Sequence, residues 1–176
     1  MRFPVSVSAS ILAAVLLILG GTFKAAAEVR ATDDRGRRIS LKAPAQRIIA
    51  LAPHVTELLF AAGAGRRLAG VDHYSDFPPA AAGITEVGDA GHADLERILG
   101  LRPDLVVAWK SGNSAGDVAH LERLGIPVFV TEPRKLADIA RLLRELGRLA
   151  GSQEMAERAA ADFERRLAQL ARRYQG

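Results

Sequence analysis

The sequence predicts an α/β fold in which a parallel sheet is flanked by helices and is followed by one long helix. Short apolar runs of strand length alternate with segments that have helical apolar spacing, from residue 47 to residue 133. Strands and helices that alternate in this way form parallel βαβ units. The last third of the chain has helical spacing only, and 176 residues are enough for one domain with a hydrophobic core.

The expected elements follow one another at regular intervals. A hairpin comes first, with its turn at residues 34–36 and its second strand at 37–41. The next strand, "RIIALAP", stops at Pro53, and a helix over "HVTELLFAAGAG" follows it. Further along the chain, strands are expected within "RLAGVDHYSDFPP", "DLVVAW" and "IPVFVTEP", and helices within "HADLERILGLRPD" and "AGDVAHLERLG".

The chain then continues in two amphipathic helices, over residues 135–151 and 152–174. A helix of about 22 residues is roughly 33 Å long, which is enough to cross a whole domain. Ser152 stands where a side chain can cap the second helix. This helix also carries an apolar stripe that needs a surface to pack against. Its members are Met155, Ala159, Phe163, Leu167 and Leu170.

Residues 1–27 have the layout of a secretory signal peptide. Arg2 precedes an apolar run over residues 11–19, and small residues stand at Ala25 and Ala27. The alternative is an uncleaved anchor helix, but the run is shorter than the ~20 residues of a membrane span. The chain has no cysteine, which excludes disulfides and the acylated cysteine of a lipoprotein. We therefore expect an exported periplasmic protein without a lipid anchor.

The distribution of charge argues against a nucleic-acid partner. The net charge is +4, but acidic and basic residues are interspersed along the chain. Binding to nucleic acid requires clustered basic side chains with aromatic residues between them. Only the final segment, "RRLAQLARRYQG", approaches that pattern.

Aromatic and histidine residues gather where the expected strands end. Ligands of parallel sheets bind outside the carboxyl ends of the strands. The loops there, together with "GDAGHAD", supply His54, His73, Tyr74, Phe77, His92 and Trp109. Large aromatic faces with a few polar groups suit a broad, mostly apolar ligand.

Four segments in order resemble a known family. "RIIALAPHVTELLFAAGAG", "LAGVDHYSDFPP", "VGDAGHADLERILGLRPDLVVAW" and "LGIPVFV" are similar to the amino-terminal lobe of the substrate-binding proteins of cobalamin, haem and iron-siderophore ABC importers. The resemblance is strongest to the cobalamin-binding members and covers residues 45–174. It implies a Rossmann-like lobe over residues 28–150 and an inter-lobe helix over 151–176. By the same resemblance the second lobe is missing, so we expect a truncated chain.

The resemblance also implies a function. The protein would capture cobalamin or a related corrinoid and deliver it to a membrane permease, without catalysis, cofactor or resident metal, and as a monomer. Haem or a ferric siderophore is the alternative ligand. Tyr74 and Trp109 match aromatic residues beside the corrin ring, and Gly112 and Asn113 match the neighbouring loop. Glu96 matches the exposed glutamate that docks on permease arginines.

His54 and His92 are further candidate ligand contacts, because one histidine of this rim could coordinate a metal centre in the ligand from above. The sequence departs from the family pattern at two places. Ala90 stands where cobalamin-binding members have a tryptophan, and Ala52 replaces the usual hydroxyl residue and so removes a helix cap. Both departures concern the ligand and leave the fold prediction unchanged.

Simpler interpretations of the same residues stay open. Trp109 could only plug the end of the sheet, Tyr74 could only anchor its loop, and Glu96 could be an ordinary solvated carboxylate. His54, His73 and His92 could converge on a metal ion, although their spacing is not that of a known ligand motif.

A metal-dependent hydrolase is the competing class of protein. Its candidate residues are Asp72, His73, Asp76, Asp89 and His92. The sequence contains no nucleophile elbow, Walker loop or dinucleotide-binding glycine pattern. We therefore expect a binding protein and not an enzyme.

Overall fold

Four parallel strands form the centre of the fold, in the order β4-β3-β5-β6. The computed structural model describes residues 28–89 and 91–174. The strands are β3 (Ile48–Ala50), β4 (Leu68–Val71), β5 (Leu105–Trp109) and β6 (Val128–Thr131). The predicted parallel sheet is confirmed. The predicted signal peptide lies outside the described residues.

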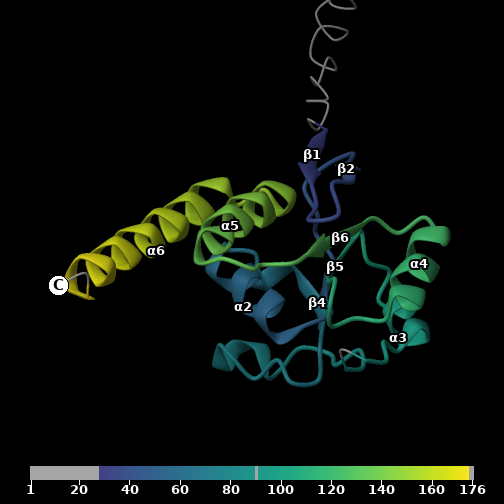
Figure 1. Cartoon of the computed structure of the whole chain (residues 1–176). Coiled ribbons are helices and arrows are strands. Elements are labelled where there is room, and N and C mark those ends of the chain that lie inside the picture. Colours follow the sequence, from purple (N-terminus) through teal and green to yellow (C-terminus); the bar gives the residue numbers. More distant parts are fainter. Residues whose placement is uncertain (1–27, 90, 175–176) are drawn as a thin grey trace, which may run out of the picture.

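Helices cover both faces of this sheet. Successive residues of a strand point to opposite faces, so strands that are apolar throughout need a cover on each side. On one face, Ile48, Val107 and Phe129 pack with α2 (Pro53–Ala61), α5 (Leu136–Ala150) and α6 (Gln153–Tyr174). On the other, Ile49 and Val106 pack with α3 (Leu95–Gly100) and α4 (Ala115–Arg123). Figure 1 shows these two groups of helices on either side of the sheet.

The chain changes direction within the sheet next to β3. From β3 it crosses through α2 to β4 at one edge, and then returns through α3 to β5 on the other side of β3. A topological switch point therefore lies between β3 and β5, which is the usual place for a ligand in an open parallel sheet.

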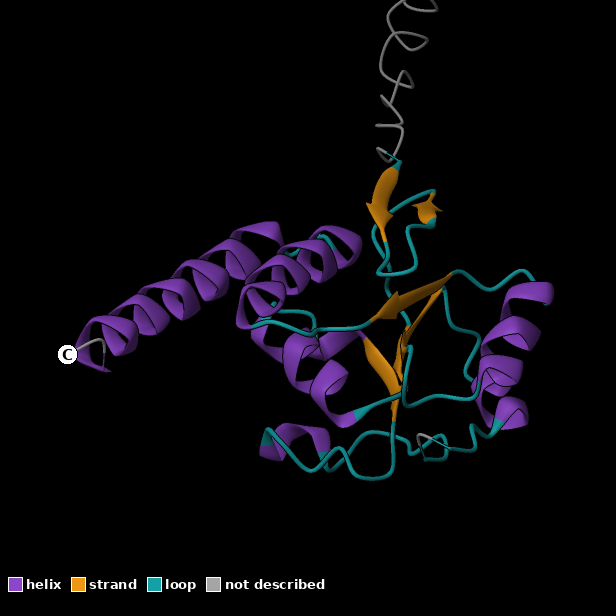
Figure 2. Cartoon of the chain, in the orientation of Figure 1, coloured by secondary structure: helices purple, strands orange, loops and turns teal. Residues whose placement is uncertain are grey.

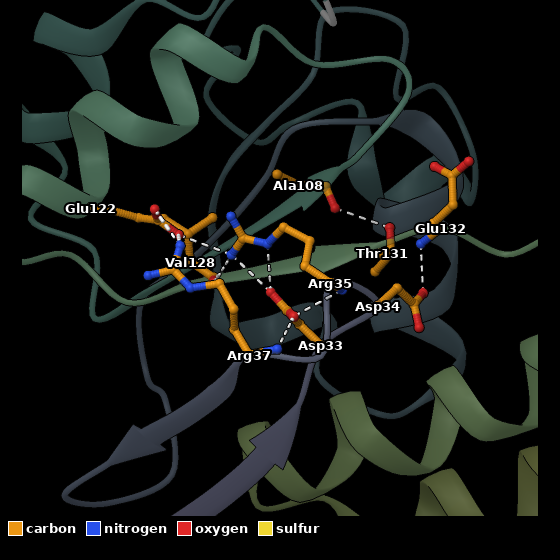
Figure 3. A network of polar contacts seen from close by, with 9 residues as sticks. All are labelled: Asp33, Asp34, Arg35, Arg37, Ala108, Glu122, Val128, Thr131 and Glu132. Atoms are coloured by element: carbon orange, nitrogen blue, oxygen red, sulfur yellow. Dashed lines mark hydrogen bonds and ion pairs between the residues drawn. The ribbon is translucent and has the colours of Figure 1, made fainter.

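An antiparallel hairpin of β1 (Val29–Thr32) and β2 (Arg38–Leu41) precedes the sheet. Its tip lies against β6, the strand at the other edge. The backbone N–H of Asp34 donates to the Val130 carbonyl at 2.9 Å. Arg35 Nη2 donates to the Val128 carbonyl at 3.3 Å (Figure 3). These are the outward-facing carbonyls of an edge strand, so the hairpin covers a surface that could otherwise pair with another chain.

The two last helices pack closely where they begin. α5 ends at Gly151 in the left-handed conformation, with φ 70°. Gly147 lets α6 approach, because a Cβ there would lie 2.1 Å from the Ala156 Cβ. Ser152 uses its hydroxyl to donate to the Ala62 carbonyl at 2.7 Å, which links the start of α6 to the end of α2.

The far half of α6 extends beyond α5, as Figures 1 and 2 show. Of the expected apolar stripe, Ala159 and Phe163 pack against the core, while Met155 and Leu170 are exposed. Within the described part of the chain, no helix combines the length and the apolar character that crossing a bilayer requires.

The long connection from β4 to α3 contains the short 3₁₀ helix η2 (Pro79–Ala81), and another, η1 (Gly65–Arg67), precedes β4. α3 begins at Leu95, the first of the apolar positions that its helical spacing names. Asp94 caps it by accepting a hydrogen bond from the Arg97 N–H at 2.9 Å, so residues 92–94 remain in the loop. α2 begins directly after Ala52 without a side-chain cap, in agreement with the prediction from the sequence.

Candidate functional site

The carboxyl ends of the four strands bring the predicted site residues to one rim. Along the sheet the order is Tyr74 after β4, His54 after β3, Trp109 at the end of β5 and Glu132 after β6. Neighbouring strands are about 4.8 Å apart, so the strands that lead to Tyr74 and Trp109 are about 10 Å apart. A rim with this spacing of strands suits a broad ligand.

Trp109 is half-buried, with part of its ring on the core of the sheet. Its backbone N–H donates to Asn113 Oδ1 at 2.7 Å, and Asn113 Nδ2 donates to the Leu51 carbonyl at 2.7 Å. Asn113 thus connects the end of β5 to the end of β3. Gly112 lies directly against the indole, since a Cβ there would be 1.9 Å from Trp109 Cε3. The predicted site residues Trp109, Gly112 and Asn113 therefore form one compact turn.

His54 contacts Trp109 from the second position of α2. The two ring centroids are 5.3 Å apart and the rings are nearly perpendicular, at 84°. Among the described residues, His54 Nε2 is buried and has no hydrogen-bond partner. Burial lowers the pKa of His54, and the charge of Glu132 opposes that shift only in part. The imidazole is therefore neutral at pH 7.

Each of these two rings lines a separate hollow. Trp109 lines one of about 290 Å³, together with Asn113, Val130 and the charged side chains of Lys110 and Glu122. His54 lines a groove of about 500 Å³ between α2, α5 and α6. Most of its other walls are apolar, and they include Leu58, Phe77, Ile139, Leu143 and Phe163. The rim thus offers aromatic and apolar surface with charged groups at one side.

Tyr74 projects from the loop after β4 and is 67% exposed. Its backbone N–H donates to Asp72 Oδ1 at 2.9 Å, and its ring meets that of His73 edge-on at 4.9 Å. Asp72 itself is buried, and burial raises the pKa of its carboxyl. A hydrogen bond of 2.9 Å between the buried hydroxyls of Thr56 and Ser75 holds the same loop. Buried hydrogen bonds therefore hold the loop, and the Tyr74 phenol stays exposed for contact with a ligand.

The histidines of the rim lie in different surroundings and do not share a site. His73 Nδ1 pairs with Glu86 Oε2 at 2.6 Å, and this hydrogen bond raises the pKa of His73. His92 is exposed in the loop before α3. Across residues 28–89 and 91–174, no three histidine or carboxylate side chains come together in a group that could hold a metal ion. Glu96 is exposed in the first turn of α3.

A polar network that the sequence does not reveal lies at the tip of the hairpin (Figure 3). Glu122 on α4 accepts hydrogen bonds from Arg35 at 2.9 Å and from Arg37 at 2.7 and 2.8 Å. Burial alone would raise the pKa of Glu122, but the two arginines outweigh it and keep the pKa below 4.5. The only sign of this network in the sequence is the dense charge of "TDDRGRR". Its partner, Glu122, lies 85 to 87 residues further along the chain.

Comparisons with known proteins identify the family. Residues 48–176 match the family model described as "Periplasmic binding protein". The chain is 40% identical over 131 residues to the vitamin B12-binding protein of Vibrio cholerae, and 42% identical over 125 residues to that of Pectobacterium atrosepticum. These alignments cover 74% and 71% of this chain but 48% and 45% of the relatives. The chain thus spans about half the length of the curated relatives it matches.

Solved structures give the same result. The periplasmic vitamin B12-binding protein of Vibrio cholerae superimposes with a TM-score of 0.73 at 39% identity, over 76% of this chain and 52% of that one. A periplasmic haem-binding protein from Pseudomonas aeruginosa gives 0.67 at 28% identity, over 72% and 46%. These relatives are named as binding proteins, as the sequence predicted for this chain. The chain belongs to the periplasmic binding protein family, among relatives that bind vitamin B12 and haem.

Proposed function

We propose that this chain captures cobalamin or a related corrinoid in the periplasm and presents it to the membrane permease of an ABC importer. The observation that carries the proposal is the position of Trp109. It is a half-buried indole at the switch point of the sheet, on the wall of a hollow, in a chain 40% identical to a vitamin B12-binding protein.

The surroundings of Trp109 suit a flat macrocycle fringed by amides. The aromatic faces of Trp109 and Tyr74 offer large rigid contact areas at little cost in side-chain entropy. Lys110, which follows Trp109 at the end of β5, lines the same hollow and can hydrogen-bond to the amides of the fringe. Binding and release then need no covalent step.

Glu96 is the proposed contact with the permease. Its carboxylate is exposed at the start of α3, on the opposite face of the sheet from the helices α2, α5 and α6. An exposed carboxylate at that position can meet a basic patch on a partner without touching the ligand.

Haem is the second candidate ligand, and a ferric siderophore would use the same rim. The haem alternative is supported by the structural similarity to the Pseudomonas aeruginosa haem-binding protein. The exposed side chains of Tyr74 and His92 could supply an oxygen or nitrogen ligand to its iron.

Equilibrium dialysis against cyanocobalamin and against haemin tests the proposal. We expect the chain to retain cyanocobalamin, and the Trp109→Ala variant to lose about 1 to 3 kcal/mol of binding free energy. Tyr174→Ala is the matched control, because Tyr174 is an exposed aromatic residue at the far end of α6. Haemin retention with a shifted absorption band would favour the second candidate. Retention of neither ligand would contradict the proposal.

A further inference from the structure

The environment of His54 points to a role that differs from direct ligand contact. We infer that His54 is a positioning residue, which sets the plane of the Trp109 indole and so prepares the aromatic wall for a flat ligand. The inference rests on the proposed ligand-binding role of Trp109. It concerns a contact between two side chains that come from different strand ends of the sheet.

The His54 and Trp109 rings meet in a T-shaped arrangement. A centroid separation of 5.3 Å and an angle of 84° lie in the preferred range for edge-to-face aromatic pairs. His54 is held firmly, because it is the second residue of α2, and both the residue before the helix, Ala52, and the next residue, Val55, are completely buried. The imidazole is thus a fixed surface against which the indole rests.

The Nε2 side of the His54 ring faces protein. Nε2 is buried and has no hydrogen-bond partner in the described part of the chain. A ligand or a metal centre that needed this nitrogen would have to displace the atoms that cover it. The imidazole therefore contributes its ring, and the neutral form that burial favours suits this role.

The Trp109 indole has little conformational freedom apart from its contact with His54. Gly112 leaves just enough room for the ring, since a Cβ would come within 1.9 to 2.7 Å of three indole atoms. Asn113 fixes the backbone of Trp109 through its 2.7 Å hydrogen bond. With the backbone and one side of the indole fixed, His54 is the aromatic contact that determines the remaining tilt. A preset ring loses less entropy when the ligand binds.

The test uses the fact that Trp109 is the only tryptophan of the chain. Near-ultraviolet circular dichroism and time-resolved fluorescence anisotropy therefore report on this one indole. We expect His54→Ala to weaken the tryptophan dichroism bands and to speed the local motion of the indole, without ligand. His54→Phe retains an aromatic edge and should restore both signals. His73→Ala is the matched control, because His73 contacts Tyr74 on the other side of the rim.

Affinity for cyanocobalamin, measured by dialysis, is the second readout. We expect His54→Ala to bind about three- to tenfold more weakly and His54→Phe to bind like the wild type, on the scale of one aromatic pair. If His54→Ala does not fold, His54→Leu replaces it, because leucine fills the space without an aromatic edge.

Two results would overturn the inference. In the first, the tryptophan spectra of His54→Ala or His54→Leu match those of the wild type. In the second, His54→Phe loses as much affinity as His54→Ala while its spectra are unchanged, which would make His54 a direct ligand contact. If no variant and no wild-type protein binds cyanocobalamin, the proposed function fails. The spectra without ligand then still decide the positioning role.

Discussion

Replacement of Asp33 by alanine tests how the hairpin is held on the sheet. The Asp33 carboxylate is completely buried at the hairpin tip. Oδ1 accepts the backbone N–H groups of Arg35 and Arg37 at 2.9 and 2.8 Å, and Oδ2 accepts Arg35 Nε at 2.8 Å. This one side chain therefore shapes the turn and orients Arg35 toward Glu122 and the Val128 carbonyl (Figure 3).

The size of the effect follows from these contacts. Breaking a buried ion pair by removal of one partner costs about 3 to 5 kcal/mol, and each hydrogen bond to a charged group contributes about 1.5 to 3 kcal/mol. Water can reach the Arg35 side chain, which is 20% exposed, and can replace part of what is lost. We therefore expect Asp33→Ala to lower the free energy of unfolding by about 3 kcal/mol. For a protein of this size that is a fall in Tm of about 6 to 12 °C.

Urea unfolding followed by circular dichroism measures this difference. Glu28→Ala is the control, because Glu28 forms an exposed ion pair with Arg30 on the same hairpin and should give no measurable change. Asp33→Asn retains one acceptor oxygen and should fall between the wild type and Asp33→Ala. A loss below about 1 kcal/mol for Asp33→Ala would refute the reasoning, since water would then replace the carboxylate almost fully.

Three further predictions concern other parts of the chain. Gly147→Ala should lose about 1 to 3 kcal/mol in urea unfolding, because its Cβ would collide with Ala156. Gly100→Ala should lose no stability, because its added Cβ meets open space. Equal losses of unfolding free energy for the two variants would contradict the close approach of α5 and α6. The folded protein lowers the pKa of Glu122, so its ionised form adds stability above pH 4.5 that is lost as the pH falls through the folded-state pKa. Glu122→Gln should thus be less stable at pH 7 and lose less stability in acid, whereas a curve parallel to the wild type would count against the network. Glu96→Ala should leave ligand affinity unchanged and lower uptake of cobalamin by cells; loss of both would assign Glu96 to the fold.

Much of the fold was predictable because the pattern of apolar residues repeats with the period of each element. Strand runs such as "LVVAW" are apolar at every position, which is typical of strands buried on both faces. Helix ends were less predictable. α3 starts at Leu95 because the capping carboxylate of Asp94 determines its first turn, and apolar spacing does not reveal that contact.

The candidate site was predictable only in outline. The strand ends placed Tyr74, His54 and Trp109 on one rim, since parallel strands end at the same edge of a sheet. Their mutual distances and their partners could not be derived. The nearly perpendicular contact of His54 with Trp109 joins the first turn of α2 to the end of β5, and nothing in the local sequence indicates it.

The sequence by itself determined the α/β class, the long terminal helix, the family and the edge of the sheet where the aromatic residues lie. These features depend on local periodicity and on short motifs, which a chain expresses without reference to distant residues. The tertiary structure alone decided that the hairpin tip covers β6, that Glu122 pairs with two arginines of that tip, and that His54 and Gly112 enclose Trp109. Those contacts join segments far apart in the chain, and they depend on how side chains fill the space between packed elements.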